Sequence, residues 1–169
     1  MQRNAVSAET LKILLQRVNY KEVFFDINLR PGHYNRQVVD FSLSQTDILK
    51  LNEEELILIG DLFEVEKKTE SRLVGWVFEM YPNIKTILLT RGPCGATVFT
   101  VGGSKDFPGI KVKVKDTVGS GDAFSAGFIM EYTKSGDIFT AAQKGNELGA
   151  FVATKSGAVP ELNDIKASE

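Results

Sequence analysis

Apolar side chains recur along this chain with two spacings, one typical of helices and one typical of buried strands. Leu11, Leu14, Leu15 and Val18 follow the helical spacing, so the pattern predicts an amphipathic helix over about 7–18. Other segments are short and almost continuously apolar, as expected for strands that a parallel sheet buries on both faces. These predicted strands cover 23–27, 48–51 and 84–89.

Helical patterns alternate with these runs. The predicted helices cover about 34–44, the stretch after Asn52, 66–80, 121–134 and 137–154. Asn52 precedes a run of glutamates that begins at Glu53, which is typical of a helix N-cap with acidic residues in the first turn. A further strand is expected at 97–101, after a turn at 91–95, and 108–114 is expected to be extended. Alternating strands and helices predict an α/β fold with a mostly parallel sheet.

Length and composition predict one globular domain over residues 1–169. Apolar residues make up 43% and charged residues 25%, which is ordinary for a soluble protein. The net charge of -2 provides no electrostatic footprint for nucleic acid. A basic group indicates only a solvated face; it consists of Lys105, Lys111, Lys113 and Lys115.

Rare residue types and hydropathy exclude several further classes of protein. The single cysteine, Cys94, excludes an internal disulfide and a cysteine-rich metal site, and it fits a reducing cytoplasm. The single histidine, His33, argues against a histidine metal site or a Ser-His-Asp triad, and we expect it at the surface or at the rim of a ligand-binding cleft. The first ten residues do not resemble a signal peptide, and no apolar run is long enough to span a membrane.

Polar residues follow each predicted strand at its carboxyl end, where open α/β sheets bind ligands. They are Asp26, Asn28 and Arg30, then Asn52 and Glu55, then Thr90 and Gly92. Trp76, by contrast, lies on a predicted helix, and we expect it in the core.

The segment 116–124 places two glycines and an aspartate where a helix begins. Glycines allow a positive φ and the close approach of a phosphate, and a helix N-terminus supplies aligned amides and partial positive charge. Asp122 could then take a proton from an acceptor hydroxyl. The ordinary alternative is that Asp122 caps the helix and the glycines form a tight turn.

The whole string Asp-Thr-x-Gly-x-Gly-Asp-x-Phe at 116–124 resembles the C-terminal signature of the ribokinase, or PfkB, family of carbohydrate kinases. Four other segments resemble family motifs in the family's order. They are Asp-x-Asn-x-Arg at 26–30, Asn-x-x-Glu at 52–55, Thr-x-Gly-x-x-Gly at 90–95, and the closing segment of 145–150 with 157–158. The resemblance implies a ribokinase-like three-layer α/β/α fold and an ATP-dependent sugar kinase.

The resemblance also implies catalytic roles. Asp122 would activate the sugar hydroxyl, and the amides of Val118, Gly119, Ser120 and Gly121 would form an anion hole for the γ-phosphate. Asn52 and Glu55 would both act near Mg²⁺ and the phosphates, Glu55 through water. A helix-dipole partner is the alternative for Glu55.

Nucleotide and cation sites are implied in the same way. Asn28 and Arg30 would face phosphate and substrate; a surface cation is the alternative for Arg30. Thr90, Gly92 and Gly95 would line the nucleotide cleft, with Asn146 near the adenine, although a hairpin turn also explains Gly95. A monovalent cation such as K⁺ would be held by Asp116 and by carbonyl groups near Val118, Val152 and Gly157.

The substrate is implied less sharply. Tyr34 after 26–31, and the closing string 157–160, look most like fructokinase-type members, which suggests fructose or a related sugar. Ribose, 2-keto-3-deoxygluconate and nucleoside kinases share most of these motifs.

Family members are usually nearly twice as long, and the glycine-rich sugar motif and β-sheet lid of their N-terminal half have no counterpart here. We therefore expect the C-terminal, nucleotide-binding part of a kinase. This part alone is expected to be inefficient in sugar phosphorylation and to form homo-oligomers or self-associate. A catalytically inactive nucleotide-binding module is the alternative. An unrelated flavodoxin-like or Rossmann domain is disfavoured because the dinucleotide fingerprint is absent.

Overall fold

The computed structural model describes residues 4–30, 32 and 34–159, so Pro31, His33 and Pro160 lie outside the described residues. The chain divides into two compact units. Unit 1 contains the residues up to Leu89 together with Phe99–Gly103. Unit 2 contains Thr90–Val98 and the residues from Ser104 onward. Within the described ranges, no helix is long and apolar enough to cross a lipid bilayer.

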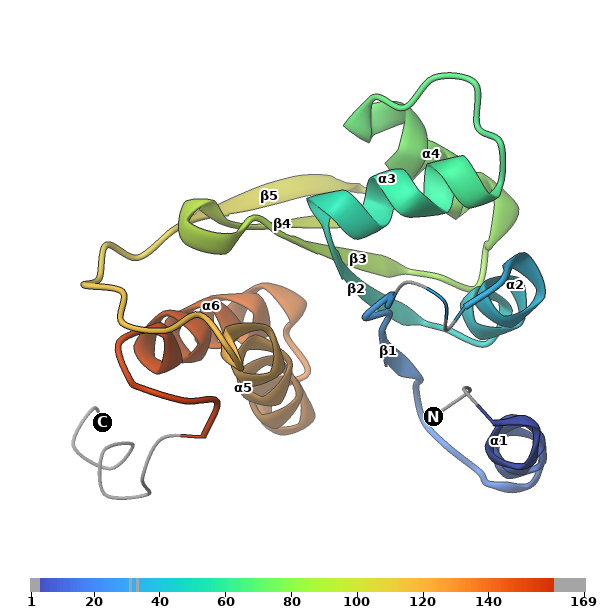
Figure 1. The fold of residues 1–169 in the computed structure, drawn as a ribbon, viewed down its shortest axis with the longest axis horizontal. Helices are drawn as coiled ribbons and strands as arrows, with labels where there is room; N and C mark the ends of the chain where they lie inside the picture. Colours follow the sequence, from blue (N-terminus) through green and yellow to red (C-terminus); the bar gives the residue numbers. More distant parts are fainter. Residues whose placement is uncertain (1–3, 31, 33, 160–169) are drawn as a thin grey trace. The chain divides into compact units, whose positions relative to one another are not determined.

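The five-stranded sheet has the strand order β1-β2-β3-β4-β5 (Figure 1). Its strands are β1 (Phe24–Asp26), β2 (Ile48–Asn52), β3 (Thr86–Thr90), β4 (Gly95–Thr100) and β5 (Gly103–Pro108). β1 and β2 are parallel, with Asp26 opposite Lys50. The short 3₁₀ helix η1 (Gly92–Cys94) joins β3 to β4, and a two-residue connection joins β4 to β5. Such short connections suit antiparallel neighbours, whereas parallel neighbours need a long crossover.

The helices of unit 1 are α1 (Ala5–Arg17), α2 (Arg36–Ser44), α3 (Glu53–Leu62) and α4 (Glu70–Met80). α3 and α4 lie side by side (Figure 1). Alternate residues of β2 and β3 enter the core of this unit, because successive side chains of a strand point to opposite faces. The core includes Leu49, Leu51, Ile87 and Leu89 from the strands and Leu43, Ile59, Leu73 and Val77 from the helices.

An aromatic cluster closes one side of this core. The ring of Phe63 lies 5.1 Å from that of Trp76, and the ring of Tyr81 lies 6.0 Å from Trp76. The expectation that Trp76 is a core residue is confirmed, since it packs partly buried against the core. The Tyr81 hydroxyl donates a 2.7 Å hydrogen bond to Asp40. Burial first, and the hydrogen bond to Asp40 second, raise the pKa of Tyr81 well above its ordinary value.

Unit 2 contains the helix pair α5 (Ser120–Ser135) and α6 (Ile138–Ala153), which pack against each other (Figure 1). Glycines let the two backbones approach closely. A Cβ on Gly145 would lie 2.8 Å from the Phe124 carbonyl oxygen, and one on Gly149 would lie 3.0 Å from that of Ser120. Glycines therefore stand among the apolar residues on the contact face of α6, because the backbones of α5 and α6 touch there and leave no room for side chains.

The predicted elements are confirmed with boundary shifts of a few residues, except at one place. The residues 109–114 form no strand, and the strand β5, at Gly103–Pro108, overlaps the predicted segment only at Pro108. Within β5 only Phe107 is buried, so the strand has no apolar run that a hydropathy pattern could detect. Cys94 lies exposed in η1, as expected for a loop residue.

We predict that Tyr81→Phe lowers the free energy of unfolding by about 1 kcal/mol, because the ring packing remains while one hydrogen bond is lost. The folded-state pKa of Tyr81 is raised above its ordinary value of 10.0. The neutral Tyr81 hydroxyl therefore contributes fully to the free energy of unfolding below pH 10, and this contribution is lost as the pH rises further. Urea denaturation of both proteins at pH 7 and above pH 10 measures both effects. Tyr20→Phe is the matched control, because Tyr20 is 41% exposed. Equal losses in the two variants would contradict the prediction.

Candidate functional site

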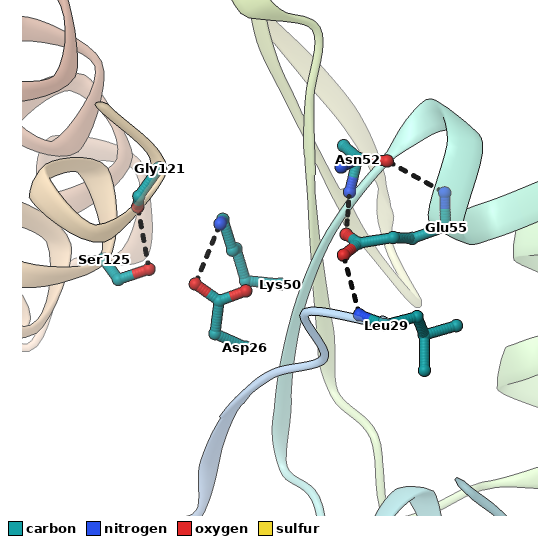
Figure 2. Close-up of polar contacts among 7 residues, drawn as sticks. All are labelled: Asp26, Leu29, Lys50, Asn52, Glu55, Gly121 and Ser125. Carbon is teal, nitrogen blue, oxygen red and sulfur yellow. Dashed lines mark hydrogen bonds and ion pairs between the residues drawn. The ribbon is translucent and has the colours of Figure 1, made fainter. Parts of the chain in front are cut away.

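In unit 1, the site residues lie where β1 and β2 end. The Lys50 ammonium lies 2.8 Å from the Asp26 carboxylate, and its side chain is only 9% exposed (Figure 2). The pairing of the strands continues one residue further, because the Ile27 amide donates a 3.1 Å hydrogen bond to the Lys50 carbonyl oxygen. A buried ammonium needs a charged partner, so this ion pair ties the end of β1 to β2.

The N-terminus of α3 forms a capping box. The Asn52 carboxamide oxygen accepts the Glu55 amide at 2.8 Å, and the Glu55 carboxylate accepts the Asn52 amide at 2.9 Å. The predicted N-cap at Asn52 is therefore confirmed. The second carboxylate oxygen of Glu55 accepts the amide of Leu29 at 3.1 Å (Figure 2). Glu55 is 9% exposed, so this carboxylate connects α3 to the loop after β1 while almost fully buried.

That loop carries two of the predicted ligand-binding residues. Asn28 has a φ of 41°, a left-handed conformation that non-glycine residues rarely adopt and that asparagine tolerates best. Arg30, like Asn28, is exposed. Both residues line a hollow of about 490 Å³ within unit 1, which α1 and α2 also line. Leu11, Phe24, Phe41 and other apolar side chains form much of its wall.

In unit 2, the turn between β3 and β4 is built from glycines. Gly92 and Gly95 have φ values of 53° and 96°. A Cβ on Gly95 would lie 2.0 Å from the Phe107 carbonyl oxygen, so β5 excludes any side chain there. Thr90 precedes this turn and is half-buried. The Asn146 carboxamide donates a 2.9 Å hydrogen bond to the carbonyl oxygen of Pro108, which holds the end of β5 to α6.

α5 begins without a side-chain cap. Its N-cap is Gly119, whose φ of 84° is left-handed. The Val118 amide donates to Asp116 at 3.0 Å and the Ser120 amide to the Thr117 carbonyl oxygen at 3.2 Å. Among the described residues, no acceptor is recorded for the amides of Gly119 and Gly121. This N-terminus therefore has donors available for an anion.

Asp122 lies in the first turn of α5 and is exposed. Within the described part of the chain its carboxylate accepts no recorded hydrogen bond, so capping does not explain it. Gly121 is exposed beside it, and its carbonyl oxygen accepts the Ser125 hydroxyl at 3.1 Å (Figure 2). The Ser120 hydroxyl oxygen is buried without a recorded partner.

Asp116 ties the loop before α5 to the segment after α6. One carboxylate oxygen accepts the Val118 amide at 3.0 Å and the other accepts the Gly157 amide at 3.1 Å. These two hydrogen bonds, the first being the larger cause, lower the pKa of Asp116. The Val152 carbonyl oxygen accepts the Lys155 amide at 2.9 Å. The predicted cation ligands are therefore already engaged within the protein: the Asp116 carboxylate and the Val152 carbonyl oxygen accept hydrogen bonds, and the Val118 and Gly157 amides donate them.

The described residues contain no group of three or more His, Cys, Asp or Glu side chains that could hold a metal ion by themselves. Mg²⁺ commonly binds through one or two carboxylates, several waters and substrate phosphates. Glu55 fits a contact of this kind only through water, because both its oxygens already accept backbone amides. Oxygen donors also suit a monovalent cation beside Asp116.

Comparison with known proteins assigns the family. The pattern of the pfkB family carbohydrate kinases matches residues 4–165, and the chain belongs to this family. Over 150 residues it is 31% identical to the probable chloroplastic fructokinase-6 of Arabidopsis thaliana. That match covers 82% of this chain and 38% of the relative.

Solved structures agree in fold. Ribokinase from Thermotoga maritima superposes with a TM-score of 0.76 at 26% identity, over 94% of this chain and 52% of that one. Fructokinase from Vibrio cholerae O395, solved with fructose, ADP and calcium, superposes with a TM-score of 0.77 at 26% identity. That match covers 96% of this chain and 55% of the other. The expected ribokinase-like α/β fold is confirmed, and the chain spans about half the length of these relatives or less.

Sequence reasoning missed Lys50. The available signal was a lysine inside the otherwise apolar run Ile48–Leu51, since a charged residue in a buried strand requires a partner. Asp26 was singled out from its motif, but its pairing with Lys50 depends on the parallel register of β1 and β2.

We predict that Gly119→Ala destabilises unit 2 more than Gly136→Ala does. Both glycines have a positive φ, 84° and 70°, so both substitutions cost about 1–2 kcal/mol in backbone conformation. Only at position 119 would the new Cβ also meet backbone, 2.6 Å from the Ala158 carbonyl oxygen. Position 136 has open space. Thermal unfolding of both variants tests the difference, and equal shifts in Tm would show that the Ala158 contact does not matter.

Proposed function

We propose that this chain carries the catalytic and nucleotide-binding residues of an ATP-dependent carbohydrate kinase. The observation that carries the proposal is the start of α5, where a left-handed glycine leaves amides without internal acceptors beside the exposed Asp122. Transfer of a phosphoryl group depends on positioning and on stabilising charge, and such a helix N-terminus can provide both. Membership of the pfkB family supports this assignment.

We assign the roles according to which groups at the start of α5 already form hydrogen bonds within the protein. Asp122 takes the proton from the acceptor hydroxyl, which suits a carboxylate with no internal hydrogen bond. The amides of Gly119 and Gly121 form the anion hole for the transferred phosphate, while Val118 and Ser120 maintain the loop through their own hydrogen bonds. The nucleotide cleft is lined by Thr90, Gly92, Gly95 and Asn146. Asn146 acts there through its hydrogen bond to the Pro108 carbonyl oxygen.

ATP and Mg²⁺ are the proposed cofactors. When bound, Mg²⁺ would neutralise charge on the phosphates. Glu55 would contact it through water, and Asn28, Arg30 and Asn52 would act on phosphate or substrate. K⁺ is proposed beside Asp116, with carbonyl groups near Val118, Val152 and Gly157 as further ligands. An exposed thiol at Cys94 fits a reducing compartment, so we place the protein in the cytoplasm.

Fructose or a related sugar is the proposed substrate. The fructokinase relative and the fructokinase structure support it, while the ribokinase structure keeps ribose as the second candidate. Calorimetric titration of the chain with ATP and Mg²⁺, followed by phosphoryl-transfer assays on a panel of sugars, separates the candidates. Nucleotide binding without transfer to any sugar would favour a nucleotide-binding module.

We predict that Asp122→Asn lowers the phosphoryl-transfer rate by about 10²–10⁴-fold, because it removes the base. The affinity for ATP should change little, since the amides of Gly119 and Gly121 remain. A coupled kinase assay measures the phosphoryl-transfer rate and calorimetry measures the affinity for ATP, both in a form of the protein that has kinase activity. Asp137→Asn is the matched control: Asp137 caps α6, and asparagine caps equally well. Full activity in Asp122→Asn would disprove the assignment of the base.

We also propose that the chain associates with itself through α1 and β1. Within the described residues β1 is the first strand in the order of the sheet, so its outer edge has no paired strand. α1 exposes Val6 and Leu14 at 74% and 53%. An open strand edge beside exposed apolar side chains favours association with a second copy.

We expect sedimentation velocity to show association that increases with protein concentration. Leu14→Lys should weaken it, because a charge replaces apolar contact area. Met130→Lys is the control, since Met130 is similarly exposed at 59% but lies on α5. A monomer at every concentration would contradict the proposal.

A further inference from the structure

The loop after β1 is fixed to β2 and α3 on both sides of Asn28. Before Asn28, the Asp26 carboxylate pairs with Lys50 and the Ile27 amide donates to the Lys50 carbonyl oxygen. After Asn28, the amide of Leu29 donates to Glu55 at 3.1 Å (Figure 2). Asn28 is thus held between two attachments in a conformation with a φ of 41°.

Glu55 satisfies two backbone amides from different segments at once. One carboxylate oxygen accepts the Asn52 amide of its own helix, and the other accepts the Leu29 amide from the loop. Hydrogen bonds to an ionised acceptor are stronger than neutral ones, and the N-terminus of α3 favours negative charge at this position. Glu55 is only 9% exposed as a residue, so water competes little for these amides.

We propose that Glu55 is a positioning residue whose carboxylate holds the 28–30 loop in one conformation before any ligand binds. Lys50 assists it from the other side by fixing the end of β1. The side chains of Asn28 and Arg30 then begin from a fixed backbone, which reduces the entropy lost on binding. This inference rests on the proposed function in so far as Asn28 and Arg30 are taken to meet a nucleotide, and it gives Glu55 a role that needs no metal ion.

Two substitutions separate the effect of the length of the Glu55 side chain from the effect of its negative charge. Glu55→Gln keeps the length but replaces one acceptor oxygen with a donor group, so one of the two amides loses its partner. Glu55→Asp keeps the charge at the start of α3 but is too short to serve both amides. Glu54→Gln is the matched control, because Glu54 lies exposed in the same helical turn.

Amide hydrogen exchange of the full 169-residue chain, followed by NMR, tests the proposal directly. We expect the Leu29 amide to exchange roughly tenfold faster or more in Glu55→Asp, because the shortened carboxylate stays with the Asn52 amide of its own helical turn, while Glu54→Gln leaves it unchanged. In Glu55→Gln, whichever of the Leu29 and Asn52 amides faces the new NH₂ group should exchange faster. The amide of Leu49, in the core strand β2, reports whether a variant has unfolded more widely. Leu29 exchange that stays at the wild-type rate in Glu55→Gln and Glu55→Asp would overturn the proposal.

A second measurement distinguishes positioning from metal binding. Calorimetric titration with the non-hydrolysable ATP analogue AMP-PNP is carried out with Mg²⁺ and again with EDTA. Both Glu55 variants should weaken binding with EDTA as well as with Mg²⁺, because the loop is affected whether or not the metal is present; any additional loss with Mg²⁺ would report the water-mediated contact. Weakening that occurs only with Mg²⁺ would assign Glu55 to the metal and overturn its positioning role. If the wild-type chain binds no AMP-PNP, the proposed function fails for this chain, and the Leu29 exchange rate alone decides whether Glu55 holds the loop.

Discussion

The amides at the start of each helix need acceptors, and the way each helix meets this need organises the molecule. Asn4, Asn35, Asn52 and Asp137 cap α1, α2, α3 and α6 with their side chains. α4, with Thr69 at its N-cap position, has no such side-chain cap, and neither has α5, with Gly119 there. Among the helices of the described residues, only α5 combines the missing cap with a left-handed glycine and with a preceding loop in which Asp116 accepts the Val118 amide. Among the described helices, the one that begins at a left-handed glycine without a side-chain cap is therefore also the one with Asp122 in its first turn.

The same need for acceptors gives Asp116 and Glu55 a structural role that does not depend on a bound ion. Each carboxylate accepts two backbone amides from segments that are distant in the chain: Val118 and Gly157 for Asp116, Leu29 and Asn52 for Glu55. Each therefore fixes a loop that carries proposed ligand-binding groups. A cation near either carboxylate would add to an arrangement that the protein already maintains.

Most of the secondary structure could be predicted from the sequence because apolar spacing determines it. The N-cap at Asn52 was predictable from local chemistry, since its partner Glu55 is three residues away. β5 was not, because its exposed residues have no apolar pattern and its pairing with β4 depends on the turn at 101–102. The hydrogen bonds from Leu29 to Glu55 and from Gly157 to Asp116 join residues far apart in sequence, which no local spacing reveals. The motif resemblance selected these residues, but only the fold shows what their carboxylates contact.

Asn28 shows how structural and chemical demands can coincide on one residue type. Between the hydrogen bonds of the Ile27 and Leu29 amides, Asn28 has a left-handed φ, which glycine and asparagine adopt at least cost. Glycine would satisfy the backbone but would remove the carboxamide. An aspartate would also tolerate the conformation, but its negative charge would repel a triphosphate. If the 28–30 loop meets nucleotide phosphates, asparagine is the residue that satisfies the backbone and the ligand together, because it combines a tolerated φ with neutral hydrogen-bond donors.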